Sequence, residues 1–297
     1  MRILALDIGG TAIKSALLDG FGHVLREIET PSEGKRGGMH LMECAKAVID
    51  EYAGYDAIGI STTGQVDARN GRIIFANENV PGYSGMQVSR ILEAHAHVPV
   101  VVENDVNAAA LGEANFGAGV GERDFLCLTY GTGVGGAIVI DGRIYGGADG
   151  VAGEMGHILT HPEGLPCACG QRGCYEQYAS TSALMRRARE VEPGLADGKA
   201  LFAQIGERQD LQAIVAAWVL EVTYGLVSLT HTLNPGLIIL GGGVMRQRVL
   251  VQAVRDQLYP RLMQSYRGVR LEGAQLGNQA GIFGAYALAR RALEETK

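Results

Sequence analysis

The chain of 297 residues is long enough for two domains, and its hydrophobic content of 47% is sufficient for buried cores. Glycine occurs 43 times without the three-residue period of collagen, so we expect the glycines to lie in specific turns. The net charge of −6, with no Lys/Arg run longer than two residues, argues against nucleic acid as a partner. Because no 18-residue apolar run and no secretion signal occur, we expect a cytoplasmic protein that does not enter a membrane.

One plan of strands and turns occurs twice along the chain. A shift of 122 positions lays Leu4 on Leu126 and the pair Asp19-Gly20 on Asp141-Gly142. In each copy an apolar strand ends in a Gly/Thr-rich turn, a second apolar strand follows (13–18 and 137–140), and an Asp-Gly hairpin leads to a third strand. The sequence therefore predicts a duplicated β-hairpin platform.

Strands and helices alternate after the first platform, which predicts parallel strands with crossover connections. Asn104 and Asp105 stand between a strand and a helix, where α/β folds place their chemistry. A carboxylate there suits the abstraction of a proton from an attacking alcohol, although Asp105 could instead serve only as a helix N-cap. The elements expected in this part are a helix at 39–52, a strand at 57–61, a helix at 84–96, a strand at 98–103 and a helix from 106.

Three glycine-rich turns follow apolar strands. They are Gly9-Gly10-Thr11, Gly131-Thr132-Gly133 and Gly241-Gly242-Gly243. Glycine lets backbone N–H groups approach an anion closely, so the three together suit a polyphosphate, although each alone could be an ordinary turn. No Gly-x-x-x-x-Gly-Lys-Ser/Thr loop is present, which argues against a P-loop enzyme. Beyond the second platform we expect a long apolar helix at 211–232, a strand at 237–240 and a last helix at 280–294.

Histidine and cysteine gather in the middle of the chain. Cys167, Cys169 and Cys174 fall within eight positions, and His157 precedes them. Three thiolates and one imidazole form a closed tetrahedral set, so we predict a structural zinc site. The alternatives are His161 as the nitrogen ligand, or a loop of free thiols without a metal.

Two glutamates bracket this cysteine-rich segment. Glu154 lies three residues before His157, and Glu176 lies two residues after Cys174. A closed zinc site would therefore hold two carboxylates near each other. The alternative is that both are solvated surface acids.

Together these motifs resemble the ROK family (repressor, open reading frame, kinase) of bacterial sugar kinases, in the actin-like ATPase superfamily, over nearly the whole chain. The resemblance implies an α/β fold, a duplicated actin-like (ribonuclease H-like) ATPase fold with two lobes around a central cleft. The implied small lobe is 1–116 plus 280–297, and the large lobe with the zinc loop is 117–279. The motifs are Asp7-Ile8-Gly9-Gly10-Thr11, Glu103-Asn104-Asp105-Val106-Asn107, Gly131-Thr132-Gly133-Val134-Gly135-Gly136, Gly153-Glu154-x-Gly156-His157 and Cys167-x-Cys169-Gly170-x-x-Gly173-Cys174-x-Glu176.

The same resemblance implies a function. It implies ATP-dependent phosphorylation of the 6-hydroxyl of a hexose by a homodimer, with Asp105 as the general base, Mg²⁺ near Asp7 and a structural Zn²⁺. The implied sugar contacts are Asn79, Asn104, Asp105, Glu154, His157 and Glu176. The implied nucleotide contacts are Asp7, Gly9, Gly10, Thr11, Gly131, Thr132, Gly133, Gly241, Gly242 and Gly243.

Two segments depart from the glucokinases of the family. Ser61-Thr62-Thr63-Gly64-Gln65 stands where they have a Pro-Gly turn, and Asn79-Val80-Pro81-Gly82-Tyr83 replaces Asn-Leu-Pro-Gly-Trp. Glucose and N-acetylmannosamine therefore both stay open as substrates. Gly64 and Gln65 are expected substrate contacts, and Gln65 and Asn77 lie where a 2-acetamido group could be read. The alternative function is a ROK-type sugar-binding regulatory protein without significant kinase turnover.

Overall fold

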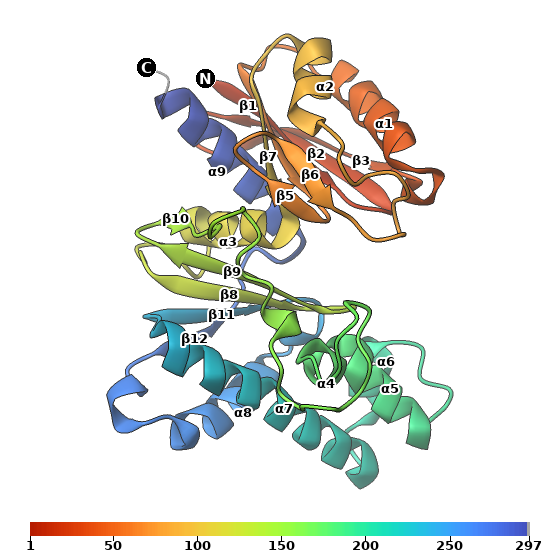
Figure 1. Ribbon diagram of the computed structural model, residues 1–297, viewed down its shortest axis with the longest axis vertical. Coiled ribbons are helices and arrows are strands. Elements are labelled where there is room, and N and C mark those ends of the chain that lie inside the picture. The colour runs from red at the N-terminus through yellow and green to blue at the C-terminus, as the bar shows by residue number, and fades with distance from the viewer. Residues whose placement is uncertain (296–297) are drawn as a thin grey trace. The chain divides into compact units, whose positions relative to one another are not determined.

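The computed structural model describes residues 1–295, and residues 296 and 297 of the predicted small lobe lie outside that part. Contacts within the chain divide it into two units, which we take one at a time (Figure 1). The first unit comprises Met1–Gly121, Gly142–Ala152 and the segment from Asn278 onward, and the second comprises Glu122–Asp141 and Gly153–Gly277. The lobe boundaries given above, after 116 and 279, stay a prediction.

A mixed five-stranded sheet of order β3-β2-β1-β4-β7 forms the centre of the first unit. The hairpin strands β1, β2 and β3 pair antiparallel, whereas β1, β4 and β7 run parallel, as the alternation of strands and helices predicts. The elements are β1 (Arg2–Ile8), β2 (Ala12–Asp19), β3 (Val24–Pro31), α1 (Gly38–Asp50), β4 (Ala57–Thr62), β5 (Gln65–Asp67), β6 (Arg72–Phe75), α2 (Val88–Ala96), β7 (Val100–Asn104), α3 (Asp105–Phe116), β10 (Arg143–Ile144) and α9 (Ala280–Glu295).

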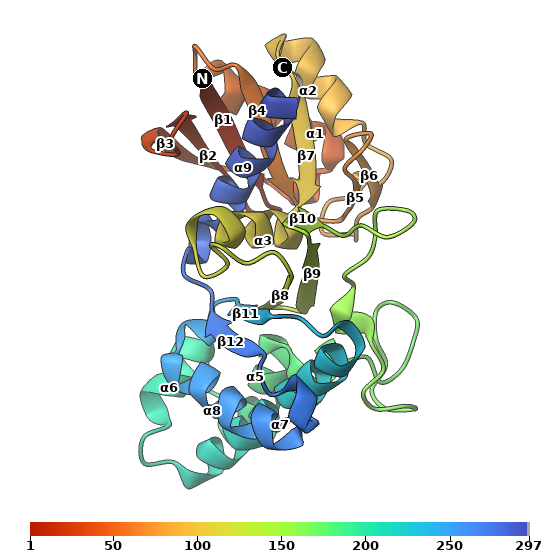
Figure 2. The same ribbon diagram turned by 90° about the vertical axis from the view of Figure 1, so that its left-hand side faces the viewer.

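Both faces of this sheet are covered, because side chains along a strand alternate between the two faces. Leu4 and Leu6 of β1 belong to a core that α1 and α2 complete. Ile3 and Ala5 point the other way, into a core completed by Tyr286 and its neighbours on α9. Figure 2 shows α9 running along the sheet on the side away from α1 and α2.

Glycines allow α3 and α9 to cross closely. A Cβ at Gly284 would lie 1.7 Å from the carbonyl oxygen of Ala108, and a Cβ at Gly112 would lie 2.5 Å from that of Ala280. Any side chain at either glycine would push the helices apart. The crossing fixes α3, which begins at Asp105.

The second unit repeats the topology of the first. The strands of its mixed sheet have the order β9-β8-β11-β12, with β8 antiparallel to β9 and parallel to β11. The duplicated platform and the two-lobed α/β fold are therefore confirmed. The remaining elements are β8 (Phe125–Tyr130), β9 (Val134–Ile140), α4 (Glu176–Ala179), α5 (Thr181–Val191), α6 (Gly198–Gln204), α7 (Gln209–Leu233), β11 (Leu237–Gly241), α8 (Arg248–Leu258) and β12 (Arg270–Gly273).

The long helix α7 is the predicted apolar helix of the second half. By length and composition alone it is apolar enough to cross a membrane. Trp218, Val222 and Leu226 are nevertheless completely buried in the core of the second unit, together with residues of β8 and β11. This burial is typical of a core helix.

Two predicted element boundaries differ from the structure by three or more residues, and both lie near glycines. The helix expected from 84 begins at Val88, because Gly82 and Gly85 have φ of +68° and +81°, which no helix accommodates. The second strand of the second platform begins at Val134 rather than Ala137, since Gly135 and Gly136 continue the ladder with β8.

Candidate active site

Asn104 and Asp105 divide the tasks at the start of α3. The Oδ1 of Asn104 accepts hydrogen bonds from the N–H groups of Val106 and Asn107, at 2.9 and 3.2 Å, so Asn104 is the N-cap. Its Nδ2 donates to Gly64 O and to Asp105 Oδ1, both at 2.9 Å. The alternative role of Asp105 as the N-cap is therefore wrong, and its Oδ1 accepts from Asn104 Nδ2 and from the Val106 N–H, both at 2.9 Å.

The environment of Asp105 makes its carboxylate more basic than usual. Desolvation by the surrounding protein, followed by the charge of Asp7, raises the pKa of Asp105 to about 6. The residue stays accessible to solvent. A carboxylate of this kind is ionised at neutral pH and still basic enough to take a proton from a hydroxyl group.

Glu103 holds Asn104 and the first turn of α3 together through hydrogen bonds. It was not among the predicted site residues. It is buried at the end of β7, and its Oε1 accepts from the N–H of Asn104 at 2.8 Å and from Asn107 Nδ2 at 3.0 Å. Burial raises the pKa of Glu103. The side chain ties the last residue of the strand to the first turn of the helix.

Two contacts fix the carboxylate of Asp7. Ser61, fully buried at the end of β4, donates from Oγ to Asp7 Oδ1 at 2.7 Å. Gly281 of α9 lies so close that a Cβ there would be 2.7 Å from Asp7 Cγ. Burial raises the pKa of Asp7, and the bond from Ser61 partly offsets the rise. Neither contact could be predicted from local sequence patterns, because β4 and α9 are far from Asp7 along the chain.

The segment after β3 holds the first glycine-rich turn through hydrogen bonds to its carbonyl groups. Ser32 Oγ donates to Gly9 O at 2.7 Å, the Ser32 N–H donates to Thr11 O at 3.0 Å, and the Gly34 N–H donates to Gly10 O at 2.9 Å. The carbonyl groups of the turn are thus engaged by the segment after β3. Thr11 itself is exposed at the surface.

Gly64, one of the predicted substrate contacts, is hydrogen-bonded to Asn104. Its φ of +97° requires glycine, and its carbonyl accepts the bond from Asn104. Gln65 begins β5 directly after it. Asn79 and Asn77 lie in an exposed turn after β6, where the Asn79 N–H donates to Asn77 Oδ1 at 3.1 Å.

The second unit brings the predicted zinc ligands together. The ligand atoms of His157, Cys167, Cys169 and Cys174 all lie within 4.8 Å of one another. The Sγ atoms of Cys169 and Cys174 are 3.6 Å apart, close to the edge of about 3.8 Å expected for a tetrahedron around zinc. The donor set and spacing therefore fit structural zinc.

His161, the alternative ligand, is engaged elsewhere. Its ring stacks on Tyr178 with centroids 3.9 Å apart, and its Nε2 lies 3.5 Å from Glu221 Oε2.

The two predicted glutamates adjoin this cluster. Glu154 Oε2 lies 3.9 Å from His157 Nε2, and Glu176 Oε1 accepts from Cys167 Sγ at 3.2 Å. Glu176 also borders the second glycine-rich turn, since a Cβ at Gly133 would lie 2.4 Å from its Oε2. Glu176 therefore lies between the Cys₃His cluster and the Gly131–Gly133 turn in the second unit.

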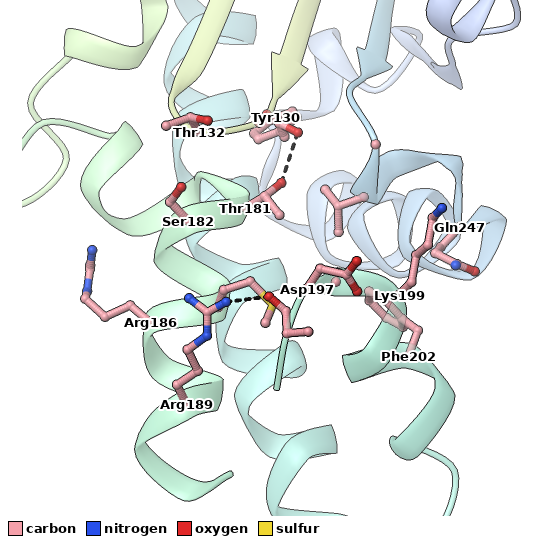
Figure 3. Close-up of a pocket in the computed structure, with 16 residues that line it drawn as sticks. Tyr130, Thr132, Thr181, Ser182, Arg186, Arg189, Asp197, Lys199, Phe202 and Gln247 are labelled. Carbon is pink, nitrogen blue, oxygen red and sulfur yellow. Dashed lines mark hydrogen bonds between the residues drawn. The ribbon is translucent and has the colours of Figure 1, made fainter. Parts of the chain in front are cut away.

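A cavity of about 710 Å³ opens beside that turn, lined by residues of β8, α5, α6 and the turn after β11. Gly242 requires glycine there, with φ of +96° and a hypothetical Cβ 2.2 Å from Tyr130 O. Gly243, Gly131 and Thr132 line the cavity, in keeping with the expected place of a nucleotide. Figure 3 shows the other side chains, among them Thr181, Ser182, Arg186, Arg189, Asp197, Lys199, Phe202 and Gln247.

Sequence reasoning missed most of these cavity residues. Met185, Phe202 and Val244 supply apolar wall, and Lys199 and Gln247 supply polar groups. The one available signal was the position of α5, which starts five residues after Glu176. No motif marks the wall that α6 and the residues before it form.

Comparisons with known proteins agree with this arrangement. The family model described as "ROK family" matches residues 3–292. The chain is 36% identical to a glucokinase of Streptomyces coelicolor over 97% of both chains, and 32% identical to an N-acetylmannosamine kinase of Salmonella paratyphi A over 98% of this chain and 99% of the other. Its structure is similar to that of a ROK family glucokinase from Streptomyces griseus in complex with glucose and AMPPNP, with a TM-score of 0.84 and 32% identity over 98% and 100% of the chains.

Proposed function

The chain belongs to the ROK family of sugar kinases, and from this premise we propose that it transfers phosphate from ATP to the 6-hydroxyl of a hexose, with Asp105 as the general base. One observation carries the assignment of the base. Asp105 is an accessible carboxylate with a pKa of about 6, oriented by the amide of Asn104 at the start of α3.

The proposed roles follow from the chemistry of each group. Asp105 accepts the proton of the attacking hydroxyl, and Asn104 holds the carboxylate in place. Further sugar contacts come from Asn79, Glu154, His157 and Glu176. The cavity of the second unit takes the nucleoside, and backbone N–H groups of the glycine-rich turns take the phosphates, because phosphoryl transfer depends mostly on positioning and charge neutralisation.

Two metal ions belong to the proposal. Asp7, held by Ser61, is the side chain of the first unit placed to bind Mg²⁺, which supplies charge neutralisation for the phosphates when it is bound. Zinc is assigned to the Cys₃His cluster, a closed set that leaves no position for catalysis.

We rank glucose and N-acetylmannosamine nearly level as the sugar, with other hexoses behind them, since relatives of similar identity carry both names. A coupled ADP-release assay over a panel of hexoses tests the function and ranks the sugars. We expect ADP release with at least one of these two. Sugar binding without ADP release from any hexose would favour the regulatory alternative.

Gln65 is the proposed reader of the 2-acetamido group, because it follows Gly64, which Asn104 binds. Gln65→Ala should lower kcat/KM for N-acetylmannosamine by the roughly 1 to 2 kcal/mol of one hydrogen bond and leave glucose nearly unchanged. Equal loss on both sugars would contradict this role.

A further inference from the structure

One wall of the nucleotide cavity is the side of α5. Thr181, Met185 and Arg189 follow one another at intervals of four, which places them on one side of the helix, and all three line the cavity (Figure 3). Another wall is the segment 196–199, which leads into α6. The shape of the cavity therefore depends on how this segment is held against α5.

The segment between the two helices has contacts at its ends. Leu195 is buried in the core of the second unit, and its N–H donates to Glu192 O at 3.2 Å. Asp197 Oδ1 accepts from the Ala200 N–H at 2.9 Å and caps α6. The carbonyl groups of Leu195 and Ala196 lie between these two anchors.

Arg189 bridges this interval. Its Nε donates to Leu195 O at 2.8 Å, and its Nη2 donates to Ala196 O at 2.6 Å. Figure 3 shows the guanidinium group directed at the segment rather than into the open centre of the cavity. A guanidinium is a rigid planar fork, so it can satisfy two successive carbonyl groups at once, which an ammonium group does not match.

We propose that Arg189 is a positioning residue for the nucleoside part of the donor site. It acts through the backbone of 195–199, holding Asp197, Gly198 and Lys199 where they line the cavity. This inference rests on the proposed function, because it takes the cavity to be the nucleotide site. When the two bonds are lost, the segment leaves its binding conformation part of the time, and apparent affinity falls with the fraction that remains competent.

The test compares ATP with adenosine as ligands of Arg189→Ala, by calorimetry on the zinc-loaded protein. We expect both dissociation constants to rise by the same factor, about tenfold, which corresponds to one binding-competent molecule in ten. The KM for ATP should rise likewise, while the KM for the sugar and kcat at saturating ATP stay within about twofold of the original values. Adenosine has no phosphate, so equal losses separate positioning of the nucleoside from a direct contact with phosphate.

The adenosine affinity of Arg189→Lys is a second test, which does not require the alanine variant to fold. This variant keeps the positive charge but lacks the two-pronged donor, so adenosine should bind more weakly than to the unaltered protein. Glu190→Ala, at the exposed neighbouring position on α5, is the matched control and should leave both affinities unchanged.

Three results would overturn the proposal. They are normal adenosine binding to Arg189→Ala, a loss confined to ATP, or full affinity in Arg189→Lys. Absence of ADP release by the unaltered protein with every hexose would instead refute the proposed kinase function, and the adenosine measurement would still decide the role of Arg189.

Discussion

Asp105 and Asn104 show how one residue position changes the chemistry of a helix start. Because Asn104 takes the capping bonds, Asp105 begins the helix with a carboxylate that a neighbouring amide orients and that solvent still reaches. Asp105 Oδ1 also accepts from the N–H of Val106, which lowers the pKa of Asp105, but burial and the charge of Asp7 outweigh this bond. Because Asn104 caps the helix, the carboxylate of Asp105 is available for its proposed role as the general base.

Asp105→Asn is expected to remove most of the turnover. The amide still hydrogen-bonds a hydroxyl group but cannot accept its proton, a loss of about 10² to 10⁴ in kcat, while sugar affinity stays within about tenfold. Steady-state kinetics and calorimetric sugar binding measure the two effects. Asp256→Asn, on the exposed side of α8, is the control. A variant that kept the original kcat would remove Asp105 from the mechanism.

The pH dependence of the reaction provides an independent check on the same residue. Only the ionised form of Asp105 acts as a base, and its pKa is raised to about 6, so kcat/KM should be constant above neutrality and fall as the pH drops through 6. At pH 5 the expected loss is about tenfold, and the residual activity of Asp105→Asn should lack this limb. An acid limb centred near pH 4 would disagree with the assignment.

At the scale of elements, the parts that sequence predicts well are those with a period or a motif. The hairpin platforms, α3, α7 and α9 follow from alternation, apolar content and turn residues, and the Cys₃His spacing anticipates the cluster of ligand atoms. Boundaries failed where glycine made the pattern ambiguous, at Gly85 before α2 and at Gly135 inside β9.

The contacts that sequence could not supply join elements distant along the chain. Ser61 and Gly281 flank Asp7 only because β4 pairs with β1 and α9 packs on the same sheet. The segment 196–199 has neither motif nor period, so nothing predicted it as a cavity wall. Such positions depend on tertiary contacts, which local patterns do not encode.

The zinc loop offers a prediction at this scale. The purified protein should carry about one zinc per chain, and Cys169→Ser should lose the metal and melt several degrees lower, because a closed zinc site contributes folding energy. Elemental analysis and calorimetry measure both. Cys44→Ser, outside the cluster, should keep its zinc. Freshly purified, chelator-free protein without zinc would contradict the assignment.

At the scale of the whole molecule we expect a homodimer. The solvent side of α7 carries partly exposed apolar side chains, with Tyr224 43% exposed, and this surface can be buried by a second copy. Light scattering at micromolar concentration should give about twice the chain mass of 31.5 kDa. A mass near that of one chain would contradict the expectation.

The central claim is that the protein phosphorylates a hexose at its 6-hydroxyl from ATP, and identifying the product tests it most directly. The protein is incubated with ATP, Mg²⁺ and either glucose or N-acetylmannosamine, and the products are assigned by ³¹P and ¹³C NMR. We predict equal amounts of ADP and a hexose 6-phosphate with at least one of the two sugars, formed about 10² to 10⁴ times more slowly by Asp105→Asn. Phosphate at another hydroxyl, or ADP with free phosphate and no sugar phosphate, would contradict the account.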